Sequence, residues 1–188
     1  MRVNEIFYSL QGEGRFVGTP AIFIRFSGCN LRCGFCDTEH EWGEELTEEE
    51  IVERIGSWPA RHVVITGGEP ALQLTASLVD RLHAQGKFVQ IETNGSVALP
   101  ENCEVDWITC SPKELRVVLR RIDELKVVYR GQDMSPYSRF EAREYYLQPC
   151  DVKDEEKNRR NISDTINYIK SNPKWKLSLQ TQKILKVR

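Results

Sequence analysis

Residues 20–36 read PAIFIRFSGCNLRCGFC, an apolar run followed by a loop that carries Cys29, Cys33 and Cys36. Strands of parallel sheets are covered on both faces and therefore read as continuous apolar runs, as residues 20–26 do. In parallel barrels and sheets, ligands bind beyond the carboxyl ends of the strands. The stretch therefore predicts a buried parallel strand that delivers three thiols to a ligand-binding edge.

The alternation of strands and helices continues along the chain. Thr47 and Glu50 form a capping box and predict the start of a helix that ends before Pro59. Leucines at four-residue spacing predict a second helix over residues 71–85, with Gly86 as its C-terminal cap. A third helix is expected over residues 155–170, and further strands over residues 62–66, 88–93, 105–110, 125–129 and 145–147.

Alternating strands and helices indicate parallel strands joined by right-handed crossovers. About six strands and about three crossover helices are too few for a complete eightfold barrel of ~250 residues. The sequence therefore predicts an α/β fold, an incomplete (partial) TIM-like barrel of about six parallel strands. No repeat, low-complexity segment or linker divides the chain, so residues 1–188 are expected to form one domain.

Polar clusters follow the carboxyl ends of five predicted strands, at the rim where parallel barrels bind ligands. The clusters are residues 27–29 (SGC), 66–70 (TGGEP), 92–95 (ETNG), 111–113 (SPK) and 148–149 (QP). We expect them to meet around one cofactor-binding cavity.

Composition excludes several classes of function. The formal net charge of −2 gives no general basic field for nucleic acid. No apolar run approaches the ~20 residues of a membrane helix, and the first residues, MRVNEIF, lack the apolar core of a signal peptide. A cytoplasmic protein is therefore expected, and its six cysteines indicate metal ligation or catalysis before disulfides.

The spacing Cys29-x3-Cys33-x2-Cys36 supplies three thiolates from one loop. Four cysteines would close a [4Fe–4S] cluster, whereas three leave one iron open for a ligand. The alternative is a zinc site that adds His40 as a fourth ligand. Two features favour the cluster. Zinc knuckles usually stabilise small modules that lack a core, whereas this chain is long enough to build one without a metal. The glycine-rich strand ends also make sense only if a cofactor lies across them. The other cysteines, Cys103, Cys110 and Cys150, lack such spacing and are expected in buried apolar roles.

CNLRCGFC together with TGGEP resembles the radical S-adenosylmethionine (SAM) superfamily. Within it, FYSLQGEG, FIRFSGCNLRC, CDT, TGGEP, ETNG, SPK and LQP, in this order, resemble the 7-carboxy-7-deazaguanine synthase family. The resemblance runs from Asn4 to about Asp151 and resumes in the tail segment LSLQTQKIL. It implies a shortened radical SAM barrel, usually a homodimer.

The resemblance also implies an activity. Members of this family convert 6-carboxy-5,6,7,8-tetrahydropterin into 7-carboxy-7-deazaguanine with loss of ammonia, on the route to queuosine. The implied cofactors are a [4Fe–4S] cluster, SAM and Mg²⁺. An electron donor such as flavodoxin or ferredoxin is an implied partner, since SAM cleavage needs an electron.

Individual roles follow from the same resemblance. Cluster ligation is implied for Cys29, Cys33 and Cys36, and Mg²⁺ contact for Thr38. Cofactor contacts are implied for Gly67, Gly68, Glu69, Asn94, Ser111, Pro112, Lys113 and Gln148. Substrate contacts are implied for Leu10, Gln11, Gly12, Arg25, Thr66 and Arg188.

Ordinary structural roles compete with these assignments. Gly67 and Gly68 suit a tight strand-to-helix turn, residues 11–14 a hairpin, Thr38 a turn, and Lys113 a helix start. The sequence favours the functional roles because the segments around these residues follow the family pattern.

Arg25 and Glu92 are charged residues within or at the end of apolar strands. An unpaired buried arginine is costly, so Arg25 needs either a structural carboxylate or, as we favour, a bidentate pair with the substrate carboxylate. Glu92 is the candidate catalytic base, since its pKa could be tuned at a strand end. A contact with the ribose of SAM is the alternative role for Glu92.

Two other functions remain to be compared. Another small radical SAM enzyme, such as a glycyl-radical activase, shares the cysteine loop and TGGEP but leaves SLQGEG and Arg25 without a role. A zinc-binding interaction module needs only the cysteines and His40.

Overall fold

The computed structural model describes residues 1–36 and 38–187. Within them, one mixed sheet runs through the molecule in the order β3-β1-β2-β4-β5-β6-β7-β8-β9. Every neighbouring pair from β2 to β9 is parallel, and β1 is antiparallel to both β2 and β3. The strands are β1 (Arg2–Leu10), β2 (Pro20–Phe26), β3 (Glu44–Glu45), β4 (His62–Gly67), β5 (Phe88–Thr93), β6 (Trp107–Cys110), β7 (Glu124–Tyr129), β8 (Glu144–Pro149) and β9 (Lys176–Leu177).

The six predicted parallel strands are confirmed as β2, β4, β5, β6, β7 and β8. The predicted fold, a partial TIM-like α/β barrel, is confirmed with them. The antiparallel strand β1 and the short strands β3 and β9 add to this set at its two ends.

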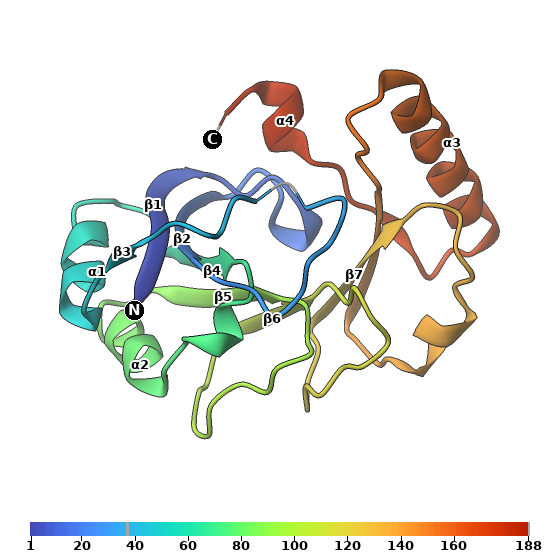
Figure 1. The fold of residues 1–188 in the computed structure, drawn as a ribbon. Coiled ribbons are helices and arrows are strands. Elements are labelled where there is room, and N and C mark those ends of the chain that lie inside the picture. The colour runs from blue at the N-terminus through green and yellow to red at the C-terminus, as the bar shows by residue number, and fades with distance from the viewer. Residues whose placement is uncertain (37, 188) are drawn as a thin grey trace.

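Three helices make crossovers between parallel strands, as predicted. They are α1 (Glu48–Ile55), α2 (Ala76–Ala84) and α3 (Glu155–Ser171), and a short helix α4 (Thr181–Leu185) follows β9. Helices α1 and α2 lie together at one end of the molecule and α3 lies at the other (Figure 1). The predicted capping box is present, since Thr47 accepts from the Glu50 amide and Glu50 accepts from the Thr47 amide. None of the helices in the described part of the chain is long and apolar enough to cross a membrane.

Helix α2 begins later than predicted. The sequence predicts a helix from Ala71, but residues Pro70–Leu72 form a 3₁₀ turn and α2 starts at Ala76. The hydroxyl of Thr75 accepts from the Leu78 amide at 3.1 Å and caps the helix there. A threonine cap satisfies a free amide of the first turn, which the leucine spacing alone does not reveal.

The core lies between the sheet and helices α1 and α2. Ile24, Ile65, Leu78 and Ile91 are fully buried in it. A second apolar cluster lies around β7 and β8, beside α3. Cys110 and Cys150 are buried, as expected for apolar roles, and Cys103 is half-buried.

The loop between β1 and β2, residues 11–19, fills the inside of the partial barrel. Phe16 from this loop packs edge-on against His62, Phe88 and Trp107, at ring-centroid distances of 4.8, 5.5 and 5.2 Å. These three aromatic residues are the first residues of β4, β5 and β6. The loop therefore closes the amino-terminal side of the barrel and leaves a cavity toward the carboxyl ends of the strands.

Candidate functional site

A cavity of about 650 Å³ opens at the carboxyl ends of the parallel strands. This volume is in the usual range for sites that hold small molecules and cofactors. Most of the residues predicted from the sequence line it, and they come from seven separate segments of the chain. They are Leu10, Gln11, Gly12, Arg25, Cys29, Cys33, Cys36, Thr38, Thr66, Gly67, Gly68, Glu92, Asn94, Ser111, Lys113 and Gln148.

Two of the predicted site residues that the structure describes do not line the cavity. Glu69 is fully buried and Pro112 is buried, and neither lines the cavity. Arg188 lies outside the described residues.

The three thiols of the cysteine loop face the cavity and form no disulfide. Cys29 Sγ accepts from the Leu31 amide at 3.4 Å, and the Cys36 thiol donates to the carbonyl oxygen of Thr38 at 3.5 Å. Burial raises the pKa of the Cys33 thiol, while the positive charge of Lys113 lowers it. Bound iron would hold these sulfurs as thiolates, because a coordinating metal deprotonates its thiol ligand.

The alternative zinc site would need its ligands gathered around a single ion. Among the described residues, no three His, Cys, Asp or Glu side chains stand close enough to hold a single metal ion, although His40 lines the same cavity. In a cluster each cysteine binds a different iron, so its ligands are farther apart than those around one ion. Three free thiols that line one cavity could therefore supply the ligands of a cluster.

Gly67 and Gly68 are required by the packing of the chain on itself. Gly67 has a φ of +144°, and a Cβ there would lie 2.2 Å from the carbonyl oxygen of Phe26. A Cβ on Gly68 would lie 2.1 Å from the carbonyl oxygen of Gly28. These glycines thus allow the end of β4 to pack against the start of the cysteine loop, and they also line the cavity.

Glu69 ties the ends of two strands together. Its carboxylate accepts from the Thr93 hydroxyl at 2.7 Å, the Asn94 amide at 2.7 Å and the Ala71 amide at 2.9 Å. Burial raises its pKa, and these hydrogen bonds lower it. Asn94 in turn donates to Asn30 Oδ1 at 3.1 Å, which connects β5 to the cysteine loop.

Arg25 has a structural carboxylate as its partner. Its Nε donates to Glu5 Oε1 at 2.8 Å, and its Nη1 lies 3.4 Å from Thr38 Oγ1. The guanidinium also lies 6.0 Å from the centroid of the Phe7 ring. Arg25 and Thr38 both line the cavity, so the guanidinium faces the same space as the cysteine loop.

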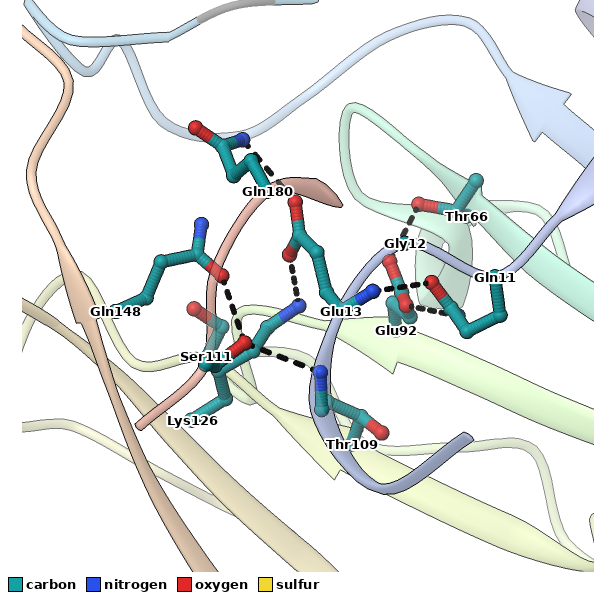
Figure 2. Close-up of polar contacts among 12 residues, drawn as sticks. Gln11, Gly12, Glu13, Thr66, Glu92, Thr109, Ser111, Lys126, Gln148 and Gln180 are labelled. Carbon is teal, nitrogen blue, oxygen red and sulfur yellow. Dashed lines mark hydrogen bonds and ion pairs between the residues drawn. The ribbon is translucent and has the colours of Figure 1, made fainter. Parts of the chain in front are cut away.

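Glu92 is held by donors on both of its oxygens. Gln11 Nε2 donates to Oε1 at 2.9 Å, and the Thr66 hydroxyl donates more weakly to Oε2 at 3.4 Å (Figure 2). Two donors suit an ionised carboxylate, which only accepts hydrogen bonds. Oε2 is the less firmly bound oxygen.

Ser111, Lys113 and Gln148 line the opposite part of the cavity. Lys113 Nζ donates to Ser111 Oγ at 2.7 Å. It also lies 6.0 Å from the centroid of the ring of Phe35, a residue that stands between Cys33 and Cys36 in the sequence. Burial, followed by the nearby charge of Lys126, lowers the pKa of Lys113. Gln148 Oε1 accepts from the Ser178 hydroxyl at 3.3 Å.

A buried ion pair on this cavity was not predicted from the sequence. Lys126 Nζ, on β7, contacts Glu13 Oε2, and Lys126 is only 5% exposed. Burial opposes the charge of Glu13, but Lys126 and the hydrogen bonds from Gln182 and Gln180 lower its pKa to about 2. Burial likewise opposes the charge of Lys126, yet the neighbouring carboxylates, first Glu13, raise its pKa above its usual range.

A signal for this pair exists in the sequence. Lys126 interrupts the apolar run of the strand ELKVVY, as Arg25 interrupts PAIFIRF. Its partner Glu13 lies more than a hundred residues earlier, so only the folded chain identifies it.

Comparison with known proteins agrees with the geometry. Residues 23–127 match the family model of the radical SAM superfamily. A 7-carboxy-7-deazaguanine synthase of Bacteroides thetaiotaomicron is 51% identical over 188 residues, which cover 100% of this chain and 98% of that protein. One of Burkholderia multivorans is 40% identical over 210 residues, with 98% of each chain covered.

Among solved structures, the crystal structure of QueE from Escherichia coli is similar, with a TM-score of 0.79 and 33% sequence identity. The match covers 95% of this chain and 93% of that one. Similarity to these proteins therefore extends over nearly the whole chain.

Proposed function

Because the chain belongs to the radical SAM superfamily and, within it, to the 7-carboxy-7-deazaguanine synthases, we propose that it converts 6-carboxy-5,6,7,8-tetrahydropterin into 7-carboxy-7-deazaguanine. The reaction releases ammonia, so the enzyme is a carbon–nitrogen lyase, and its product leads to queuosine. The observation that carries the proposal is the convergence of the cysteine loop and the strand-end residues on one cavity.

The cluster and SAM would be held at one end of this cavity. Cys29, Cys33 and Cys36 would bind three irons, and the backbone at Gly67 and Gly68 would lie beside the cofactor. Asn94, Ser111, Lys113 and Gln148 would contact SAM from the neighbouring strand ends, with Glu69 and Pro112 supporting them from behind. When bound, these groups supply the electron-driven cleavage of SAM that starts radical chemistry on the substrate.

The substrate would lie between the loop after β1 and the end of β5. Leu10, Gln11 and Gly12 would contact the pterin ring, whose amide and amidine edges suit backbone groups and a glutamine. Arg25 would pair with the substrate carboxylate through its Nη atoms, since Glu5 engages Nε. Thr66 would contact the substrate beside Glu92.

Glu92 is the residue that we assign to proton transfer. Loss of ammonia with ring rearrangement requires a proton to move, and a general base must lie within hydrogen-bond reach of it. Oε2 would accept the proton, because its bond from Thr66 is long at 3.4 Å. Gln11 would hold the other oxygen in place.

Further parts of the proposal concern the surroundings of the reaction. Mg²⁺ would bind near Thr38, mainly through substrate oxygens and water, since a neutral hydroxyl is a weak magnesium ligand. An electron donor such as flavodoxin or ferredoxin would reduce the cluster. The protein would work in the cytoplasm as a homodimer, and a contact of Arg188 with the substrate belongs to the same proposal.

Anaerobic reconstitution with iron, sulfide, SAM, Mg²⁺, reductant and the carboxytetrahydropterin tests the function. The expected product is lighter than the substrate by one ammonia, measured by mass spectrometry. SAM cleavage without this product would contradict the proposed substrate.

Metal analysis of the anaerobically purified protein tests the cluster separately. We expect iron and sulfide, loss of both in Cys33→Ser, and retention of both in His40→Ala. Zinc without iron, lost in His40→Ala, would contradict the cluster and identify a zinc module.

A further inference from the structure

Polar contacts connect Lys126, Glu13, Gln11 and Glu92 in series (Figure 2). It begins at Lys126 Nζ, which contacts Glu13 Oε2. The backbone N–H of Glu13 donates to Gln11 Oε1 at 3.1 Å, and Gln11 Nε2 donates to Glu92 Oε1 at 2.9 Å. Because the oxygen of Gln11 is engaged by Glu13, its amide nitrogen is the group that faces Glu92.

The C-terminal tail holds the same loop from its other side. Glu13 Oε1 accepts from Gln180 Nε2 and from Gln182 Nε2, each at 3.0 Å. The backbone N–H and the hydroxyl of Thr181 donate to the carbonyl oxygen of Gly12 at 3.0 and 2.8 Å. Residues 12 and 13 are therefore fixed between β7 and the tail.

The charges make this arrangement rigid. Lys126 is 5% exposed, and the side chain of Glu13 is 14% exposed. Separating such a pair would leave an uncompensated buried charge, which is strongly unfavourable. The pair and the tail bonds thus oppose a shift of the backbone at residue 13, whose N–H holds the side-chain oxygen of Gln11.

We propose that Glu13 is a positioning residue, whose anchoring to Lys126 and to the tail glutamines sets, through Gln11, the orientation of the Glu92 carboxylate toward the substrate. Glu13 itself need not touch the reacting atoms. This inference rests on the proposed function, in which Glu92 accepts a proton. It adds that docking of the tail is a condition for product formation, because the tail supplies two of the donors to Glu13.

The test compares Glu13→Gln with the wild-type holoenzyme. The variant keeps the size of the side chain and removes its charge. We expect kcat for the carboxylated deazaguanine to fall at least tenfold, with less than a threefold change in the KM for the pterin. The amount of 5′-deoxyadenosine released per product should rise at least fivefold, because SAM cleavage continues while proton transfer is misaligned.

Hydrogen–deuterium exchange supplies a readout that does not depend on turnover. The Thr181 amide, bonded to Gly12, should exchange faster in Glu13→Gln than in the wild type. Glu44→Gln is the matched control, since Glu44 also pairs with a cation, Arg54, at 2.8 Å but on the exposed surface away from the cavity. It should match the wild type in every measurement.

Three further variants cover the case in which Glu13→Gln does not fold. Gln180→Ala removes one donor to Glu13, and we expect the same rise in 5′-deoxyadenosine per product, smaller in size. Lys126→Arg keeps the positive charge and Lys126→Met removes it. The ratio of 5′-deoxyadenosine to product should therefore stay closer to the wild-type value in Lys126→Arg.

The inference fails if Glu13→Gln and Gln180→Ala keep the wild-type ratio of 5′-deoxyadenosine to product. It fails equally if kcat and SAM cleavage fall by the same factor, which would indicate a purely structural role. These outcomes are distinct from failure of the proposed function, in which the wild-type enzyme itself splits SAM and forms no deazaguanine.

Discussion

The carboxylate of Glu92 lies among neutral donors and close to one cation. Gln11 and Thr66 bond to its two oxygens, and its charge acts on Lys126 across the cavity. In the proposed reaction, these hydrogen bonds would orient the carboxylate, and Oε2, whose bond from Thr66 is long, would accept the proton. On this proposal, Glu92 would react, and Gln11 and Thr66 would orient it.

Glu92→Gln should lower the rate of product formation about 10²- to 10⁴-fold, which is the usual contribution of a general base. The amide is nearly the same size, so the cavity and SAM affinity should be retained. Product formation and SAM binding are measured on the reconstituted enzyme, with Glu53→Gln on the exposed face of α1 as control. Weakened SAM binding with an unchanged rate would instead identify Glu92 as a contact of the SAM ribose.

Glu13 should make the stability of the fold depend on pH in the acid range. Burial opposes its charge, yet Lys126 and the glutamines lower its pKa from 4.5 to about 2 in the folded protein. A lowered folded-state pKa gives stability that is present above pH 4.5 and is lost as the pH falls toward 2. Urea unfolding at pH 5 and pH 3 should therefore show a smaller loss of stability for Glu13→Gln than for the wild type. Equal losses would contradict this origin of the acid sensitivity.

Sequence alone could identify many of these residues because their chemistry contrasts with their surroundings. A charged side chain in an apolar strand, such as Arg25, is easily recognised in the sequence. Its partner cannot be recognised there, because Glu5 reaches Arg25 through the antiparallel pairing of β1 with β2. The sequence consequently predicted that Arg25 needs an anion, with a structural carboxylate as the less favoured of two partners, but it did not identify Glu5.

At the scale of elements, the loop after β1 and the tail helix α4 fit closely together. A Cβ on Gly12 would lie 1.9 Å from Gln182 Oε1 and 3.0 Å from the Gln182 backbone nitrogen. The absence of a side chain at residue 12 is thus what lets the tail approach the loop.

Gly12→Ala should displace α4 and reduce product formation at least tenfold, because the added methyl group overlaps Gln182. In the double variant Gly12→Ala/Gln182→Ala part of the activity should return, since most of the overlap is with the Gln182 side chain. Gly56→Ala serves as control, as its nearest neighbour would be 3.2 Å away at the end of α1. If the effects of Gly12→Ala and Gln182→Ala on product formation simply add in the double variant, a direct contact between the two residues is contradicted.

Element boundaries show where periodicity stops being informative. The strands β2, β4 and β5 match their predicted ranges closely, because buried apolar runs leave little choice. The start of α2 differs from its predicted position. The side chains of Glu69 and Thr75 accept hydrogen bonds from the backbone amides of Ala71 and Leu78. Such local hydrogen bonds compete with the helix at positions that the apolar spacing cannot distinguish.

At the scale of the whole molecule, the partial barrel is completed by pieces that are not parallel strands. The loop over residues 11–19 fills its amino-terminal side, and the tail after β9 bonds to that loop. The Gly14 amide donates to Ser178 Oγ at 3.0 Å, which joins segments that follow strands near the two ends of the sheet. The sequence predicted the parallel strands, and the family resemblance implied that the tail, residues 176–188, lies near the active site. Neither identified these contacts, because they join distant segments.

Phe16→Ala should destabilise the fold by about 3 kcal/mol, the lower end for loss of a packed phenylalanine, since Phe16 is only half-buried. Its ring contacts the first residues of three strands, so its loss loosens the amino-terminal side of the barrel. Val17→Ala, exposed beside it, should change stability by less than about 0.5 kcal/mol. Urea denaturation checks both values, and equal effects would contradict the packing role of Phe16.

The bonds between Glu13 and the two tail glutamines join residues that are 167 and 169 positions apart in the chain. Contacts of such long sequence separation carry a high loop-closure cost and form late in folding. During synthesis, residues 180 and 182 must leave the ribosome before this side of the cavity can assemble. Cys29, Cys33 and Cys36 would therefore be accessible before the cavity around them is complete, so the proposed cluster could be inserted while the protein is still being made.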